Sequence, residues 1–304
     1  MTATPLVPLT SLDAQLHAKL EFLHPSGSMK HRAIPPFLAA LRASPRGREL
    51  TDVIVRSAGA AAVTAAWSCA QLGLRATAVL PPSASDQLLA LLGWLGATAH
   101  RAPLPEGTAL MARLGRAPGA YVLDQAREPG LTDPYRVVAA ELLAQLPALA
   151  SVVVGIGTGH GITGIARELR DRGGRVAVYG TEPAEAAVAS GATWAPHGIP
   201  GLAPPNGGPL AEAALLAGIE PVPSAEAWEL ARRVARETGW LVGPSSGATV
   251  AAALRLRARG VRGPLVAICA CQAQEYVSLT HQRALGAITG RAPSPEGEEA
   301  AHVV

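Results

Sequence analysis

Short apolar runs alternate with Ala- and Leu-rich amphipathic segments along most of this chain, and this alternation constrains the fold more than any other feature. Continuous β-branched runs are typical of parallel strands buried on both faces, and helical segments between them act as crossovers. We therefore predict an α/β fold with mostly parallel sheets. Strands are predicted at 52–57, 75–81, 121–124, 151–156, 175–180 and 264–270, and helices at 61–72, 85–96 and 161–173.

The composition argues against several classes of protein. Apolar residues make up 49% of the 304 residues and charged residues 16%, which is typical of a compact globular protein. The sequence has neither a membrane-spanning apolar stretch nor a signal-like N-terminus, so we expect a cytoplasmic protein with no membrane partner. A net charge of +3, scattered arginines and 4% aromatic residues argue against nucleic-acid binding.

The three cysteines give no sign of disulfides or of a metal site. Cys69 stands alone, and Cys269 and Cys271 are two residues apart without a second pair of ligands. An odd count without a framework argues against structural disulfides, and a single pair is not a zinc pattern. We expect no metal.

A glycine loop follows the predicted strand at 151–156 and precedes a predicted helix. Glycines let the backbone approach an anion, and the helix N-terminus offers unpaired N–H groups, so GIGTGHGITG (155–164) is a candidate phosphate site. Within it, GHGITG (159–164) matches the dinucleotide fingerprint, and Glu182 lies at about the expected distance. Both a nicotinamide site and a turn needed only for packing are therefore open at this point.

A lysine stands after a Ser/Gly-rich turn in KLEFLHPSGSMKHR (19–32). Lys30 could form a Schiff base with a carbonyl if its surroundings favoured the neutral amine. The alternative is an ordinary surface lysine at the start of a helix.

Six segments, in the same order along the chain, resemble segments of the cysteine synthase and cystathionine β-synthase family, which are pyridoxal-phosphate (PLP) enzymes of fold type II. They are TPLV (4–7), KLE…HPSGSMK (19–30), GIGTGHGITG (155–164), TEPAEAAVASG (181–191), HGIPGLAPP (197–205) and VGPSSGATVAAAL (242–254). The resemblance covers residues 4 to about 279. Ordered matches are far more specific than any single one, so the family explains both the loop and Lys30.

The resemblance implies a tryptophan synthase β-like fold of two three-layer α/β/α domains. Residues 1–37 and 137–290 would form the large PLP-binding domain, and 38–136 a small mobile domain that closes over the substrate. The composition of 291–304 predicts a disordered tail. Family members are commonly dimers, so we expect a homodimer.

The resemblance also implies roles for individual residues. Lys30 would hold PLP covalently, and the other cofactor-binding residues would be Gly157, Thr158, Gly159, His160, Gly161, Ala60, and Cys271 or Gln272 near the pyridine nitrogen. The substrate-binding residues would be Ser57, Ala58, Gly59, Ala61, Gln125 and Gly201.

The chain departs from the family pattern on the substrate side. SAGAAA (57–62) stands where the family has TSGNTG, and His160 replaces a glycine. Each lost hydrogen bond to a charged group is worth roughly 1.5–3 kcal/mol, so two losses would weaken the binding of an ordinary amino-acid substrate by about a hundredfold or more. These changes indicate altered substrate preference or lost activity. In the same loop, Gly161 stands where the family has a threonine, so a hydroxyl is lost there. A protonated His160 is predicted either to offset that hydroxyl or to point its side chain to solvent.

The function predicted from the resemblance is β-replacement on a small serine-derived amino acid, by a lyase or transferase of amino-acid biosynthesis. The expected donor is of the O-acetylserine or O-phosphoserine type, and the expected nucleophile is sulfide, a thiol or an amine. Lys30 would remove the α-proton while the cofactor takes up the resulting charge. Two alternatives stay open. One is β-elimination, as in dehydratases of the same fold, and the other is a degenerate homologue that acts as a binding partner.

Overall fold

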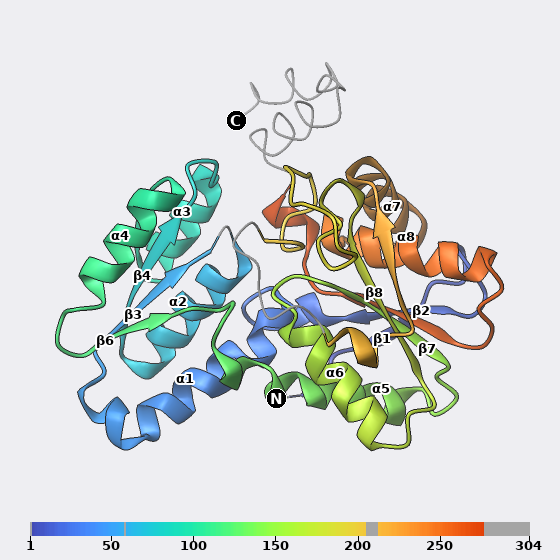
Figure 1. Cartoon of the computed structure of the whole chain (residues 1–304), viewed down its shortest axis with the longest axis horizontal. Helices are drawn as coiled ribbons and strands as arrows, with labels where there is room; N and C mark the ends of the chain where they lie inside the picture. Colours follow the sequence, from blue (N-terminus) through green and yellow to red (C-terminus); the bar gives the residue numbers. More distant parts are fainter. Residues whose placement is uncertain (1, 58, 205–211, 277–304) are drawn as a thin grey trace, which may run out of the picture.

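Two β-sheets lie in two lobes of the molecule, as the computed structural model shows for residues 2–57, 59–204 and 212–276 (Figure 1). The larger sheet has the strand order β1-β2-β10-β7-β8-β9, and only the β1–β2 pair is antiparallel. Its strands are β1 (Leu6–Pro8), β2 (Leu16–Leu20), β7 (Ser151–Gly155), β8 (Ala177–Pro183), β9 (Gly218–Val222) and β10 (Leu265–Cys269).

The smaller sheet is parallel throughout and has the order β5-β4-β3-β6. Its strands are β3 (Asp52–Arg56), β4 (Arg75–Leu80), β5 (Thr98–Arg101) and β6 (Ala120–Leu123). All four lie within the predicted small domain at 38–136. The limits of the two domains and the mobility of the smaller one stay predictions.

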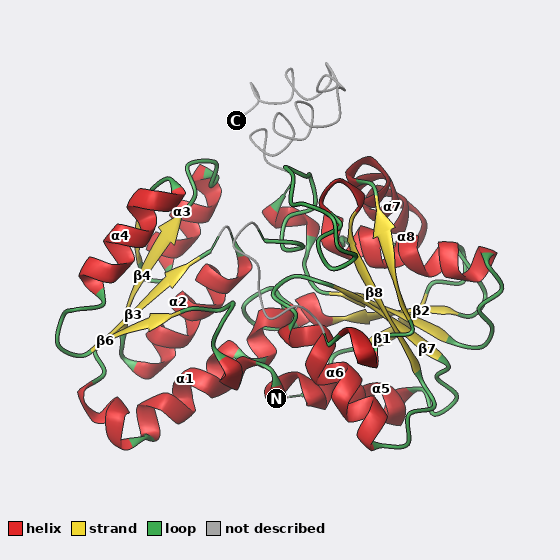
Figure 2. Cartoon of the chain, in the orientation of Figure 1, coloured by secondary structure: helices red, strands yellow, loops and turns green. Residues whose placement is uncertain are grey.

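Helices cover both faces of each sheet (Figure 2). They are α1 (Ile34–Ala43), α2 (Ala60–Leu72), α3 (Asp86–Trp94), α4 (Leu104–Leu114), α5 (Arg136–Gln145), α6 (His160–Asp171), α7 (Ser224–Thr238) and α8 (Pro244–Ala258). In the larger sheet, Val152 and Val154 pack toward α5 and α6, whereas Val153 packs toward α7 and α8. Successive strand residues point to opposite faces, which is why these runs are apolar throughout.

The predicted class, α/β with mostly parallel sheets, is confirmed, and a strand lies at each of the six predicted positions. The sequence reasoning missed β1, β2, β5 and β9. The predicted tail at 291–304 lies outside the described residues. Within the described ranges, no helix is long and apolar enough to cross a membrane.

Candidate active site

The segment that carries Lys30 is held against the end of strand β10. Lys30 lies in a short 3-10 helix, Met29–Arg32, whose first turn is capped because the Ser28 hydroxyl accepts the Lys30 N–H at 3.3 Å. The Met29 N–H donates to the Ala270 carbonyl at 2.9 Å, and Ser28 forms an isolated bridge with Cys271. The lysine is therefore fixed at the carboxyl edge of a parallel sheet, where ligands of α/β proteins commonly bind.

The amine of Lys30 faces a cavity. Burial lowers the pKa of this amine from 10.5 to about 8, and no hydrogen bond or ion pair joins its Nζ to another described residue. The sequence contains only one other lysine, Lys19, whose Nζ lies fully buried 2.6 Å from the Glu141 carboxylate. Lys30 is thus the only lysine available to react with a carbonyl compound.

The glycine loop after β7 lines the same cavity. A Cβ at Gly157 would lie 2.5 Å from the Gly201 carbonyl oxygen, and Gly159 has a φ of 88°, so both positions require glycine. No side chain caps helix α6, which starts at His160. The first N–H groups of a helix have no partner within it, so this loop presents donors and a partial positive charge to an anion.

The polar end of the cavity is formed by Ser245 and Cys271. The Ser245 Oγ lies 2.8 Å from the Cys271 Sγ, and both residues line the cavity. Gln272 instead lies beside Gly27 and lines a neighbouring cavity with Glu275. Of the two residues predicted near the pyridine nitrogen, the structure therefore brings only Cys271 to the Lys30 cavity.

The predicted substrate residues line an adjoining part of the cavity, of about 240 Å³, which Lys30 and Thr158 share. The structure brings Ser57, Gly59, Ala60, Ala61, Gln125 and Gly201 to this part. Ala58 lies outside the described residues. Helix α2 begins at Ala60 without a side-chain cap, so its first N–H groups also face the cavity without an intrahelical partner.

The His160 side chain points neither to solvent nor into the cavity. It is 3% exposed, and its Nδ1 lies 2.6 Å from the Thr132 hydroxyl. Burial lowers the pKa of the imidazole, which therefore stays neutral near pH 7. The two side-chain orientations predicted for it are not found, because the ring packs against the segment that carries Gln125 and Thr132. Its backbone N–H remains at the start of α6.

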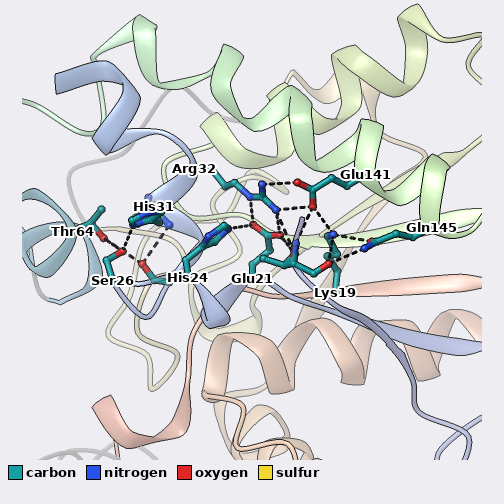
Figure 3. Close-up of polar contacts among 12 residues, drawn as sticks. Lys19, Glu21, His24, Ser26, His31, Arg32, Thr64, Glu141 and Gln145 are labelled. Carbon is teal, nitrogen blue, oxygen red and sulfur yellow. Dashed lines mark hydrogen bonds and ion pairs between the residues drawn. The ribbon is translucent and has the colours of Figure 1, made fainter. Parts of the chain in front are cut away.

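A buried ionic network supports the Lys30 segment from behind (Figure 3). Arg32 donates two hydrogen bonds to Glu21, at 2.8 and 2.9 Å, and two more to Glu141, at 2.6 and 2.7 Å. Lys19 completes the network with its own bond to Glu141. Arg32, Glu21 and Lys19 are all fully buried, so each charge depends on its partners.

Sequence reasoning missed several residues that line the cavity. They include Ser28, Tyr135, Ser245, Thr249 and Tyr276. Ser28 and Ser245 lie inside two of the matching segments, so those motifs already held the signal. Tyr135 and Tyr276 follow no pattern that would have singled them out.

The cavity suits an aldehyde that carries an anionic group. An available lysine with a lowered pKa can bond to the aldehyde carbon, and the glycine loop with an uncapped helix can hold the anion. Glu182, which matched the dinucleotide fingerprint, instead accepts hydrogen bonds from Ala189 and Ser190 within its own turn. The fold and the cavity are those of a PLP-dependent enzyme.

Comparison with known proteins gives the family. Residues 1–271 match the family described as "Pyridoxal-phosphate dependent enzyme", and the chain belongs to it. It is 30% identical to cysteine synthase 3 of Caenorhabditis elegans over 268 residues, which are 84% of this chain and 80% of the relative. The cofactor is therefore pyridoxal phosphate, and the protein is an enzyme of the cysteine synthase-like group, whose chemistry is β-replacement.

Solved structures agree. The crystal structure of O-ureido-L-serine synthase superimposes with a TM-score of 0.84 at 26% identity, covering 98% of this chain and 96% of that one. An O-acetylserine dependent cystathionine β-synthase from Helicobacter pylori gives a TM-score of 0.80 at 27% identity, covering 91% and 94%.

Proposed function

We propose that this protein catalyses β-replacement on a serine-derived amino acid, with a donor of the O-acetylserine or O-phosphoserine type and sulfide, a thiol or an amine as nucleophile. The observation that carries the proposal is the position of Lys30. Its amine faces one cavity that joins the glycine loop at 157–161 to the predicted substrate residues. The names of two relatives, a cysteine synthase and an O-acetylserine dependent cystathionine β-synthase, support the same donor class.

On the cofactor side, we assign the covalent attachment to Lys30 and the phosphate to the N–H groups of 157–161 together with the Thr158 hydroxyl. Cys271, beside Ser245, takes the position facing the pyridine nitrogen. When bound, the cofactor supplies an electron sink for the charge left by a departing α-proton. The Lys30 Nζ, whose pKa burial lowers to about 8, would accept that proton.

On the substrate side, backbone groups replace the family's side chains. The Gly59 N–H donates to the Ser57 hydroxyl at 3.1 Å, and the next N–H groups at the start of α2, those of Ala60 and Ala61, are placed to bind the substrate carboxylate. Gln125 reaches the same cavity, and its Nε2 donates to the Arg56 carbonyl at 3.2 Å. Closure of the smaller lobe would exclude water from the reacting atoms.

The test is an assay of purified holoenzyme with O-acetylserine, with and without sulfide, followed by product analysis. We expect cysteine to form only when sulfide is present. Pyruvate formed at the same rate in both reactions would instead assign β-elimination. A panel of serine derivatives, monitored through the absorption of the bound cofactor, then identifies the preferred donor.

A second candidate is a homologue that binds the cofactor without turnover, because Ala60 and Ala61 bring no hydrogen-bonding side chains to the cavity. It predicts a yellow protein whose absorption no amino acid changes. The homodimer and the cytoplasmic location also stay predictions, and analytical ultracentrifugation of the holoenzyme tests the first of them.

A further inference from the structure

A larger cavity, of about 620 Å³, opens beside the substrate part of the active site. The two share Gln125, Thr158 and Pro204 as lining residues, so they adjoin each other. This neighbouring cavity, which we call the side cavity, lies against helix α4 and the ends of strands β3 and β6. Its volume lies within the roughly 300–1,000 Å³ typical of small-molecule sites.

One wall of the side cavity is apolar, and two arginines, Arg56 and Arg127, also line the cavity. Leu104, Met111 and Val122 supply the apolar surface. Arg56, the last residue of β3, lines the cavity, and its Nη1 donates to the Leu104 carbonyl at 3.3 Å. A Cβ at Gly107 would overlap the Arg56 guanidinium, so the glycine makes room for this position of the charge.

The Arg56 charge has no carboxylate partner among the described residues. The one acidic residue that lines the side cavity, Asp124, accepts from Arg127 at 3.4 Å and from the Ala126 N–H at 3.1 Å. Arg56 is a half-buried residue at the carboxyl edge of a parallel sheet, and a guanidinium that no carboxylate of the described residues neutralises is suited to bind a carboxylate or phosphate.

The chemistry of β-replacement says which part of a substrate enters the side cavity. The bond from the β-carbon to the leaving oxygen breaks, and oxygen keeps the electron pair. A new bond forms between the same carbon and the nucleophile, whose proton is released. Nothing is oxidised or reduced. The leaving group and the nucleophile therefore share one space next to the β-carbon.

We propose that the side cavity binds the anionic group of the β-substituent, and that Arg56 determines this specificity. The proposal rests on the proposed function, which it narrows to substrates with a carboxylate or phosphate beyond the β-carbon. The anion is either the carboxylate of an organic nucleophile, such as a carboxylated thiol, or the phosphate of the donor. Both anions would bind a guanidinium in the same way, and the two arms of the experiment below distinguish them.

The experiment compares matched pairs of substrates with the holoenzyme. In the nucleophile arm, O-acetylserine reacts with mercaptoacetate or with neutral 2-mercaptoethanol. In the donor arm, sulfide reacts with O-phosphoserine or with O-acetylserine. The readout is the ratio of kcat/KM for the anionic member to kcat/KM for the neutral member in each arm.

We expect Arg56→Gln to lower this ratio about tenfold in the arm that supplies the anion, which is the effect of losing one charged hydrogen bond. Gly107→Ala should lower the same ratio with Arg56 still present, because its Cβ displaces the guanidinium. Arg113→Gln is the matched control. It removes an exposed charge from α4 outside the side cavity and should leave the ratio unchanged.

A ratio that Arg56→Gln and Gly107→Ala leave unchanged in both arms would overturn the inference, while measured β-replacement would leave the proposed function standing. Absence of β-replacement with every pair in the wild-type holoenzyme would overturn both. Retention of the cofactor absorption in each variant shows that the fold is intact.

Discussion

Two walls of the active-site cavity differ in how they are built. The first, in the larger lobe, is the Lys30 segment, which is held by fully buried charges that pair with one another. The second, in the smaller lobe, is the start of helix α2, where alanines stand at 60 and 61. The first wall is fixed by at least four hydrogen bonds from Arg32 alone. The second presents backbone N–H groups, which carry no side-chain specificity. We infer from this difference that the side chains that select the substrate lie elsewhere, as proposed for the side cavity.

The largest expected effect comes from removing the Lys30 amine, which belongs to the first wall. We expect Lys30→Ala to lower β-replacement at least about a thousandfold, because it removes both the covalent attachment and the base. Borohydride reduction followed by peptide mass spectrometry should find the cofactor on Lys30 in the wild type. A cofactor adduct found at Lys19 would refute the assignment.

Breaking the network behind Lys30 should cost stability. We expect Arg32→Met to lower the free energy of unfolding by about 3 kcal/mol, because Glu21 and Glu141 then lose their buried partner. Chemical denaturation measures the change. Arg75→Met, which breaks an ion pair whose arginine side chain is 74% exposed, is the control and should cost less than about 1 kcal/mol. Equal losses of unfolding free energy in the two variants would show that the buried network stabilises the protein no more than an exposed ion pair does.

The lowered pKa of Lys30 predicts how the apoenzyme takes up cofactor. Only the neutral amine bonds to an aldehyde, so the rate of uptake should rise with pH and level off above about 8, not near 10.5. Stopped-flow absorbance between pH 6 and about 11.5 checks the midpoint of this rise in rate. A midpoint near 10.5 would show that burial does not affect this amine.

Substitutions at Cys271 and Gln272 should differ in their effect on cofactor affinity, because only Cys271 lines the Lys30 cavity. We expect Cys271→Ala to weaken cofactor binding severalfold through the loss of a neutral hydrogen bond. Gln272→Ala is its neighbour control and should leave the affinity unchanged. Fluorescence titration of each apoenzyme with the cofactor measures the two affinities. A larger loss of affinity in Gln272→Ala than in Cys271→Ala would assign the pyridine nitrogen to Gln272 instead.

The smallest expected change tests the second wall. If backbone groups have taken over substrate binding, Ala60→Asn should not improve the KM for the preferred donor. A gain of tenfold or more, as one restored charged hydrogen bond would give, would show instead that the alanine loop is a simple loss.

Much of the fold follows from local sequence pattern. The runs at 52–57 and 151–156 are apolar throughout because helices cover both faces of their sheets, and they are found as β3 and β7. By contrast, β2 was missed because its sequence, LHAKL, contains a lysine and a histidine. That strand is nevertheless buried, because Lys19 pairs with Glu141 more than a hundred residues later, and no local pattern reveals such a partner.

The site residues that belong to a glycine motif could be predicted from the sequence. The direction of a side chain could not be predicted where it depends on a contact with a residue far away in the sequence. Gly157 and Gly159 stand in a glycine-rich motif that the sequence shows directly, and the structure gives the steric and conformational reasons why both are glycine. The direction of the His160 ring depends on Thr132, which belongs to a distant segment. The same holds for Arg56 at the end of strand β3, whose position depends on Gly107 in helix α4.

The scarcity of lysine has a practical consequence for handling the protein. Free pyridoxal phosphate ordinarily decorates many surface lysines of a protein and obscures its stoichiometry. Here a reagent selective for primary amines meets, besides the terminal α-amine, only two lysine side chains, of which Lys30 lines a cavity and Lys19 is held in a buried ion pair. Cofactor occupancy can therefore be counted per chain by simple absorbance, and chemical tagging at lysine would report on the active site alone.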